Sequence, residues 1–392
     1  MGSLVRSRSD TTAGLRATRA ALSALFLLNG VGIASWAAHV PYIKQRFGFS
    51  DAILGLALLF VALGSVVALL GGARLVARFG SRVVVVTAAF IFCSALALLM
   101  VVPLASLLFP LLACFGACIG AMEVGINVQA VEVEKRYARP IMSGFHALFS
   151  VGGLLGAAIA ALSLARGVPP SAHMGIVALA LVVIVIIGMP QLLPAEPSRT
   201  AGGPTLALPR GPLLGLGMLA FFCLVAEGAM ADWSAVYLRD RLGTDAAFAA
   251  AGYAAFSVAM AAGRFGGDRL RAWTSAVILV RISAALAALG LGAALLVAQP
   301  LAGLLGFACV GLGLANIVPI LFTAAGRTPG VASEVGIAAV ASFGYFGFLI
   351  GPPLIGFVAQ ATSLSWGLAL VAFFIAIIAL LARGAGRAEL QG

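Results

Sequence analysis

The chain has 392 residues, of which 62% are hydrophobic and 9% are charged, and its formal net charge is +11. An average soluble domain is about 25% charged, so this composition excludes an ordinary soluble protein and indicates a chain that lies largely within a bilayer. Most of the basic excess falls in the loops on one side of the predicted membrane spans. It therefore does not indicate a nucleic-acid-binding surface.

Apolar stretches of about 20 residues recur along the whole chain, and each can cross a hydrocarbon core of about 30 Å as a helix. We predict an all-α membrane protein with twelve transmembrane helices. The approximate spans are 20–41, 51–73, 83–103, 107–131, 141–165, 172–193, 211–238, 246–267, 272–298, 300–325, 333–359 and 362–382. In the eleventh span Gly351-Pro352-Pro353 predicts a break or kink, because two prolines remove two backbone donors.

Basic residues are distributed asymmetrically over the predicted loops. With a cytoplasmic N-terminus, 19 of the 24 lysines and arginines lie inside and only five lie outside. The outer five are Lys44, Arg46, Arg166, Arg239 and Arg241. Because cytoplasmic loops are enriched in Lys and Arg, we predict that both termini are cytoplasmic.

A motif at the end of the first span returns at the end of the seventh. Residues 42–48 (YIKQRFG) and 237–243 (YLRDRLG) match at an offset of 195, and Asn127…Pro140 matches Asn316…Pro329 at an offset of 189. A repeat of half the chain within apolar sequence is typical of a duplicated transporter, whose substrate site lies between the halves near the bilayer midplane.

The proline- and glycine-rich segment from Pro194 to Pro212 cannot sustain a helix and predicts a linker between two halves. The expected organisation is a cytoplasmic tail at 1–19, a six-helix bundle at 20–193, a cytoplasmic linker at 194–212, a six-helix bundle at 213–383 and a cytoplasmic tail at 384–392. Every other loop is short, so we expect no soluble catalytic domain, no enzyme activity and no cofactor. The five cysteines lie in apolar segments without a clustered histidine, so no metal site is expected.

The loop after the second span resembles the signature loop of the major facilitator superfamily (MFS). Arg78, Gly80 and Arg82 match the signature, whereas Ala77 stands where the family usually has aspartate. In this superfamily such loops tie helix ends together at the cytoplasmic side. The resemblance therefore implies a conformational latch, for which the candidates in the two halves are Arg78, Arg82, Arg264, Asp268 and Arg269.

Residues 123–150, together with residues 227–234, look like a branch of bacterial inner-membrane permeases distantly similar to fucose permease. The resemblance implies the MFS fold with two pseudo-symmetric bundles, the bacterial inner (plasma) membrane and transport by alternating access. In fucose permease an acid in the first helix and one in the fourth serve sugar binding and proton coupling. Here the fourth span holds Glu123, whereas the nearest polar residue in the first is Asn29.

Three acidic residues, Glu123, Glu227 and Asp232, lie deep within predicted spans. A charge at that depth costs at least about 2.5–3.5 kcal/mol, so acids retained there tend to be functional. None recurs at the aligned position of the other half, as a scaffold residue often would. We predict proton coupling for these acids and for His146, whose imidazole titrates near physiological pH. Structural salt bridges and a packing role for the histidine remain the alternatives.

Polar and aromatic residues at depth are the candidates for binding the solute. Asn127 lies one turn from Glu123 on the same helix face, and its counterpart Asn316 leaves a structural role between helices equally open. Trp36 and Trp233 fit stacking on a sugar or aromatic ring as well as they fit anchoring at the membrane interface. The full set is Asn29, Trp36, Asn127, Trp233, Asn316 and Tyr345.

These observations predict a secondary transporter for a small polar, sugar-like solute. The sequence shows no ATP-binding motif, so the energy would come from an ion gradient or from the gradient of the solute itself. Carboxylates at membrane depth suit proton exchange, so we predict protons as the coupling ion. Its partners would be the solute, protons and the lipid bilayer, without nucleic acid, and it would function as a monomer. Two alternatives remain open: proton-driven efflux of an amphipathic toxic compound, and a membrane sensor or scaffold without transport.

The predicted topology can be tested with reporter fusions. We expect fusions at Pro204 and Gly392 to report a cytoplasmic location and a fusion at Arg166 to report a periplasmic one, because basic residues concentrate on the cytoplasmic side. A periplasmic signal at Pro204 would contradict the twelve-helix topology.

Overall fold

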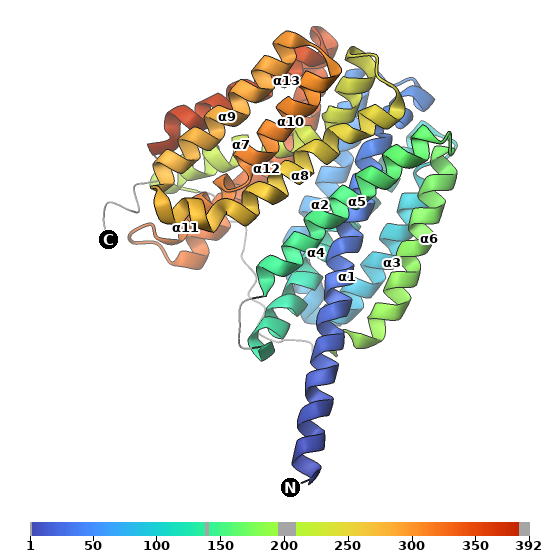
Figure 1. Ribbon diagram of the computed structural model, residues 1–392, viewed down its shortest axis with the longest axis vertical. Coiled ribbons are helices and arrows are strands. Elements are labelled where there is room, and N and C mark those ends of the chain that lie inside the picture. The colour runs from blue at the N-terminus through green and yellow to red at the C-terminus, as the bar shows by residue number, and fades with distance from the viewer. Residues whose placement is uncertain (1, 138–140, 195–208, 384–392) are drawn as a thin grey trace. The chain divides into compact units, whose positions relative to one another are not determined.

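The computed structural model describes residues 2–137, 141–194 and 209–383, and all of their regular secondary structure is helical (Figure 1). Twelve of the segments in this part of the chain are long and apolar enough to cross a membrane, which confirms the all-α class and the predicted number of spans. The elements are α1 (Gly2–Phe47), α2 (Asp51–Phe79), α3 (Ser81–Leu98), α4 (Ala105–Tyr137), α5 (Met142–Ala165), α6 (Pro170–Gly188), η1 (Met189–Gln191), α7 (Pro212–Val236), η2 (Tyr237–Arg241), α8 (Ala246–Trp273), α9 (Ala276–Val297), α10 (Pro300–Leu314), α11 (Ile317–Gly326), α12 (Ser333–Ala361) and α13 (Leu364–Leu381).

Helix α1 begins at Gly2, well before the first apolar span predicted at 20–41. Residues 2–19 of the predicted polar tail are therefore helical and form the first part of α1. Met1 lies outside the described residues. The alanine, leucine and arginine residues of this segment are good helix formers, and it contains no proline. The cytoplasmic location of this segment stays a prediction.

The tenth predicted span is two helices, α10 and α11, separated at Ala315 and Asn316. Pro319 explains the break, because a proline ring clashes with the carbonyl four residues earlier, here that of Ala315, and supplies no N–H to bond it. The Asn316 side chain joins the break between α10 and α11 to helix α8, since its Nδ2 donates to the backbone carbonyl of Gly263 at 2.9 Å.

The two prolines of α12, unlike Pro319, do not interrupt their helix. The break predicted at Gly351-Pro352-Pro353 does not occur, and the helix is continuous from Ser333 to Ala361. Prolines are tolerated within transmembrane helices where surrounding protein accommodates the freed carbonyl groups. The proline segment is covered by protein, because a Cβ atom added at Gly55 of α2 would lie 2.6 Å from the Pro352 carbonyl oxygen.

Helix α7 ends in one wide π turn, η2. The Leu242 N–H donates to the carbonyl of Tyr237 at 3.2 Å, and the hydroxyl of Thr244 donates to the carbonyl of Leu238 at 2.9 Å. A π turn holds one residue more than an α turn, so the side chains that follow it are rotated by about 100° from where a continued α-helix would place them. Asp240 lies within this turn.

The chain forms two compact units that do not follow its order. Unit 1 comprises Met1–Ser35, Leu63–Gly156 and Pro169–Gly203, and unit 2 comprises Trp36–Ala62, Ala157–Val168 and Pro204–Gly392. Unit 2 therefore joins the ends of α1 and α5 and the beginning of α2 to the second half of the chain. The boundaries predicted for the two six-helix bundles stay predictions.

In unit 1, glycines bring the backbones of α1 and α5 into direct contact. A Cβ atom added at Gly30 would overlap with the carbonyl of Phe149, and one added at Gly152 would overlap with the carbonyl of Leu27. Gly156, one turn further along α5, meets Val31 in the same way. Small residues spaced four apart allow this approach between helices, which gain van der Waals contact from it.

We expect Gly152→Ala to lower thermal stability, because the added methyl group would separate α1 from α5 at a cost of about 1–3 kcal/mol. The matched control is Gly144→Ala in the same helix, since an added Cβ meets nothing within 4 Å there. Thermal unfolding of the detergent-purified variants measures the difference. Equal melting temperatures for the two variants would contradict this account of the contact.

Candidate functional site

A row of polar side chains runs along α7 and α8 in unit 2. It consists of Glu227 and Asp232 on α7, and Tyr253, Ser257 and Arg264 on α8. The Arg264 Nη2 atom lies 3.9 Å from Glu227 Oε1. The Tyr253 hydroxyl is hydrogen-bonded to Ser257 and lies within electrostatic range of both acids and of Arg264. We refer to these five residues as the α7–α8 polar row.

The Glu227–Arg264 pair is accessible although both residues belong to candidate membrane spans. The Glu227 side chain is 28% exposed and that of Arg264 is 42% exposed. Charged groups at membrane depth are costly against lipid and almost always face the protein interior or a water-filled space. The exposed surface of this pair is therefore expected to face water.

Asp232 adds a second acid to the row. It is half-buried, and no described residue forms a hydrogen bond or an ion pair with its carboxylate. A carboxylate in this position can take up a proton or accept a hydrogen bond from a solute. The predicted proton-coupling residues Glu227 and Asp232 thus lie in one arrangement with a tyrosine and an arginine.

The candidates of unit 1 lie on α1, α4 and α5. Glu123 is half-buried, and the Nδ2 of Asn127 donates to the Glu123 backbone carbonyl at 2.7 Å, so this amide is bonded within its own helix. His146 is exposed, and its ring lies edge-on to Phe26 at a centroid distance of 5.3 Å. Asn29 is 3% exposed, and its Oδ1 has no hydrogen-bond partner within the described part of the chain.

The aromatic candidates all belong to unit 2. Trp36 and Trp233 are both buried, which disfavours anchoring at the membrane interface. The ring of Tyr345 stacks on Phe348 at 6.5 Å. Phe348 packs against α7 at Gly228, where an added Cβ would lie 3.0 Å from the ring. This contact places the Tyr345–Phe348 pair beside the helical turn that holds Glu227.

Asn316 connects two helices. Its amide nitrogen donates to Gly263 of α8, and an added Cβ at Gly267 would overlap with its Oδ1. These contacts support the structural alternative for this residue. Its predicted role in solute binding stays a prediction.

The structure describes three of the five latch candidates, Arg78, Arg82 and Arg264. The Arg78 guanidinium lies 5.1 Å from the ring centroid of Phe79, and Arg82 follows Gly80, whose φ of 80° ends α2 and starts α3. Arg264 pairs with Glu227. The side chains of Asp268 and Arg269 lie outside the described residues, so the latch stays a prediction.

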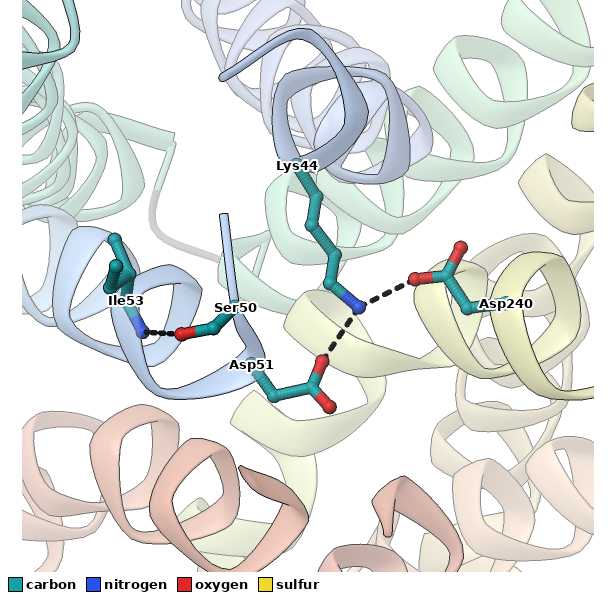
Figure 2. A network of polar contacts seen from close by, with 5 residues as sticks. All are labelled: Lys44, Ser50, Asp51, Ile53 and Asp240. Atoms are coloured by element: carbon teal, nitrogen blue, oxygen red, sulfur yellow. Dashed lines mark hydrogen bonds and ion pairs between the residues drawn. The ribbon is translucent and has the colours of Figure 1, made fainter. Parts of the chain in front are cut away.

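Sequence reasoning missed a cluster of three charges in unit 2. The Lys44 Nζ atom lies 2.6 Å from Asp51 Oδ1 and 2.6 Å from Asp240 Oδ2 (Figure 2). Lys44 and Asp240 belong to the two copies of the repeated motif, so the signal was present, but nothing in the sequence showed that the copies meet. Tyr253 and Ser257 were also missed, since neither stands in a recognisable pattern.

Comparisons with known proteins agree with one another. The sequence model of the Major Facilitator Superfamily matches residues 20–336. An uncharacterised MFS-type transporter of Yersinia pestis is 37% identical over 362 residues, which are 92% of this chain and 94% of that protein. The membrane protein MosC of Rhizobium meliloti is 36% identical over 377 residues, 94% of this chain and 89% of that protein.

A crystal structure of a bacterial homologue of the human lysosomal transporter Spinster, in an inward-facing and occupied conformation, resembles this chain with a TM-score of 0.75. The alignment covers 95% of this chain and 96% of the other. At 15% sequence identity this likeness shows the fold alone.

We expect Asn316→Ala to lower thermal stability by about 0.5–1.5 kcal/mol, because the variant loses the hydrogen bond that joins Asn316 to α8. Asn127→Ala is the matched control, since its amide bonds only the carbonyl one turn earlier in its own helix, and such bonds add little to helix stability. Thermal unfolding of both variants measures the difference. An Asn316→Ala variant as stable as the wild type would contradict the structural role.

Proposed function

The chain belongs to the Major Facilitator Superfamily, and from this premise we propose that it is a proton-coupled secondary transporter of a small polar solute. It is a multi-pass membrane protein of a family of transporters. The proposal adds alternating access, a sugar-like solute, a monomer in the bacterial inner membrane and cytoplasmic termini.

The α7–α8 polar row is the observation that carries the proposal. Its ion pair is loose, because 3.9 Å between Arg264 Nη2 and Glu227 Oε1 exceeds hydrogen-bond distance. Both groups therefore retain donors and acceptors for a third group. A solute with hydroxyl groups could bond to the guanidinium, to the Glu227 carboxylate and to the Tyr253 hydroxyl in one place.

The aromatic pair beside this row suits a ring-shaped solute. The Tyr345–Phe348 stack lies next to the turn of Glu227, and an aromatic face offers an apolar surface to one side of a sugar ring. Polar groups on one side and an aromatic face on the other are typical of small-molecule sites.

Protons are the coupling ion that fits these acids best. In a low-dielectric environment the charged form of a carboxylate is disfavoured, so proton uptake and release follow changes in its access to water. Asp232 and Glu123 are half-buried acids within candidate spans. A transporter that moves such an acid from one aqueous side to the other carries its proton along with the solute.

Efflux of an amphipathic compound is the second candidate, and the phenylalanines of α7 and α12 favour it. Phe343 lies 6.0 Å from Phe221 and 6.3 Å from Phe346, measured between ring centroids. Such a group of rings could bind an apolar moiety. Efflux would use the same acids with the solute moving in the opposite direction.

A thermal-shift screen of the purified protein separates these candidates. A ligand that binds only the folded state raises the melting temperature in proportion to the logarithm of its concentration over its dissociation constant. Shifts with sugars or polyols support the first candidate, and shifts confined to amphipathic aromatic compounds support efflux.

The role of Glu123 can be tested with the solute that the screen identifies. Glu123→Gln imitates a permanently protonated carboxyl group, so we expect the variant to lose accumulation against a gradient. It should still exchange labelled for unlabelled solute, because exchange requires no net release of a proton. The measurement is radiolabel flux in proteoliposomes with and without an imposed pH gradient.

Glu227→Gln is the comparison variant, expected to weaken solute binding more than coupling because Glu227 pairs with Arg264 in the polar row. Wild-type accumulation by Glu123→Gln from about pH 5 to 8, a range above the unperturbed glutamate pKa of about 4.3 that includes the histidine pKa of about 6.5, would show that Glu123 is structural.

A further inference from the structure

The charge cluster of Lys44, Asp51 and Asp240 connects segments that are far apart in the sequence. Lys44 lies in the last turn of α1, Asp51 is the first residue of α2, and Asp240 lies in the π turn η2 after α7 (Figure 2). The lysine and Asp51 belong to the first repeat and Asp240 to the second. One ammonium group thus has a carboxylate partner in each half of the chain, both at 2.6 Å.

We propose that these residues form a gate on the periplasmic side, in which Asp240 closes the gate and Asp51 retains Lys44 when the gate opens. The inference rests on the alternating access proposed above. The distribution of basic residues predicts that the end of α1 with Lys44 lies on the outer side of the membrane, and we therefore assign the cluster to the periplasmic side.

The shared lysine makes opening possible at low cost. The Lys44 side chain is only 15% exposed, so a lysine with Asp240 as its single partner would be left on opening as a poorly hydrated ammonium without a counter-charge. With Asp51 in place, opening removes one of two carboxylates and leaves the other bonded.

Two further contacts in unit 2 contain small residues. Gly55 of α2 lies against the backbone of Pro352 and Pro353, and an added Cβ at Gly356 would lie 2.6 Å from the Asp51 carbonyl oxygen. A second contact joins Ala38 of α1, Ala160 of α5 and Ala250 of α8, all buried, and Leu164 packs against it. Glycine and alanine side chains bury little apolar area, so separation of these residues exposes little apolar surface.

These contacts give Asp51 and Asp240 opposite effects on one equilibrium. Asp240 is bonded to Lys44 only in the closed arrangement, so its loss favours the open one. Asp51 is bonded to Lys44 in both arrangements, but in the open one it is the only partner, so its loss favours the closed one. A charge cluster that merely stabilises the fold would not show opposite signs.

A cysteine placed behind the gate measures its opening. Ala38 is 5% exposed within the alanine contact, so Ala38→Cys, in a chain with the five native cysteines replaced, reacts with a membrane-impermeant maleimide only when the contact opens. In intact cells we expect Asp240→Asn to raise the rate of alkylation about fivefold and Asp51→Asn to lower it about fivefold, as an ion-pair energy of about 1 kcal/mol implies.

Glu132→Gln is the matched control, because it removes an acid from an ion pair within a single helix, with Arg136 Nε at 3.0 Å, and should leave the rate unchanged. Melting temperature and monodispersity confirm that each variant is folded. Should Asp51→Asn fail to fold, Asp51→Ser takes its place, since serine is also favourable at the start of a helix.

Rates that change in the same direction in both variants, or that change in neither, would overturn the proposal. The measurement needs no solute and no proton gradient. The alkylation result is therefore valid even if the solute or the role of Glu123 is assigned wrongly. Conversely, the flux experiments can still be interpreted if the gate proposal fails.

Discussion

The hydrocarbon core of the membrane admits neither unpaired backbone groups nor lipid-facing charges, and the structure of this chain follows from that constraint. Side chains make hydrogen bonds at two irregular points of the helices. The Thr244 hydroxyl donates to the carbonyl of Leu238 in the π turn after α7. Asn316, at the break between α10 and α11, donates to the Gly263 carbonyl of α8 and so ties the break to a neighbouring helix.

The same constraint gives meaning to the few charges at depth. Glu227 and Arg264 keep accessible surface within candidate membrane spans, and Asp232 lies nearby, half-buried. Charged groups within membrane spans are costly, so residues retained there are candidates for a functional role. Their grouping with Tyr253 and beside a stacked aromatic pair is the basis on which we propose a solute site in this half of the chain.

Two helix contacts of this chain use small residues in different ways. Between α1 and α5 in unit 1, Gly30 on one helix and Gly152 and Gly156 on the other bring the two backbones together. In unit 2, the contacts between the two repeats include single glycines, alanines and one shared lysine. The first contact is continuous along two helices, whereas the second consists of separate patches, as the proposed gate requires.

The sequence by itself determined the all-α class, the twelve spans, the repeat and the family, because span length, apolar composition and loop charge are local properties. It also indicated Glu123, Glu227 and Asp232 as candidate site residues, since an acid within apolar sequence is conspicuous, and this assignment stays a prediction. It did not reveal the break at Asn316, where Pro319 was the available signal, or the partners of Lys44. Asp240 is 196 residues from Lys44, and helices that are apolar on most faces carry no periodicity to show which side faces which neighbour. Only the tertiary packing brings these two charges into contact.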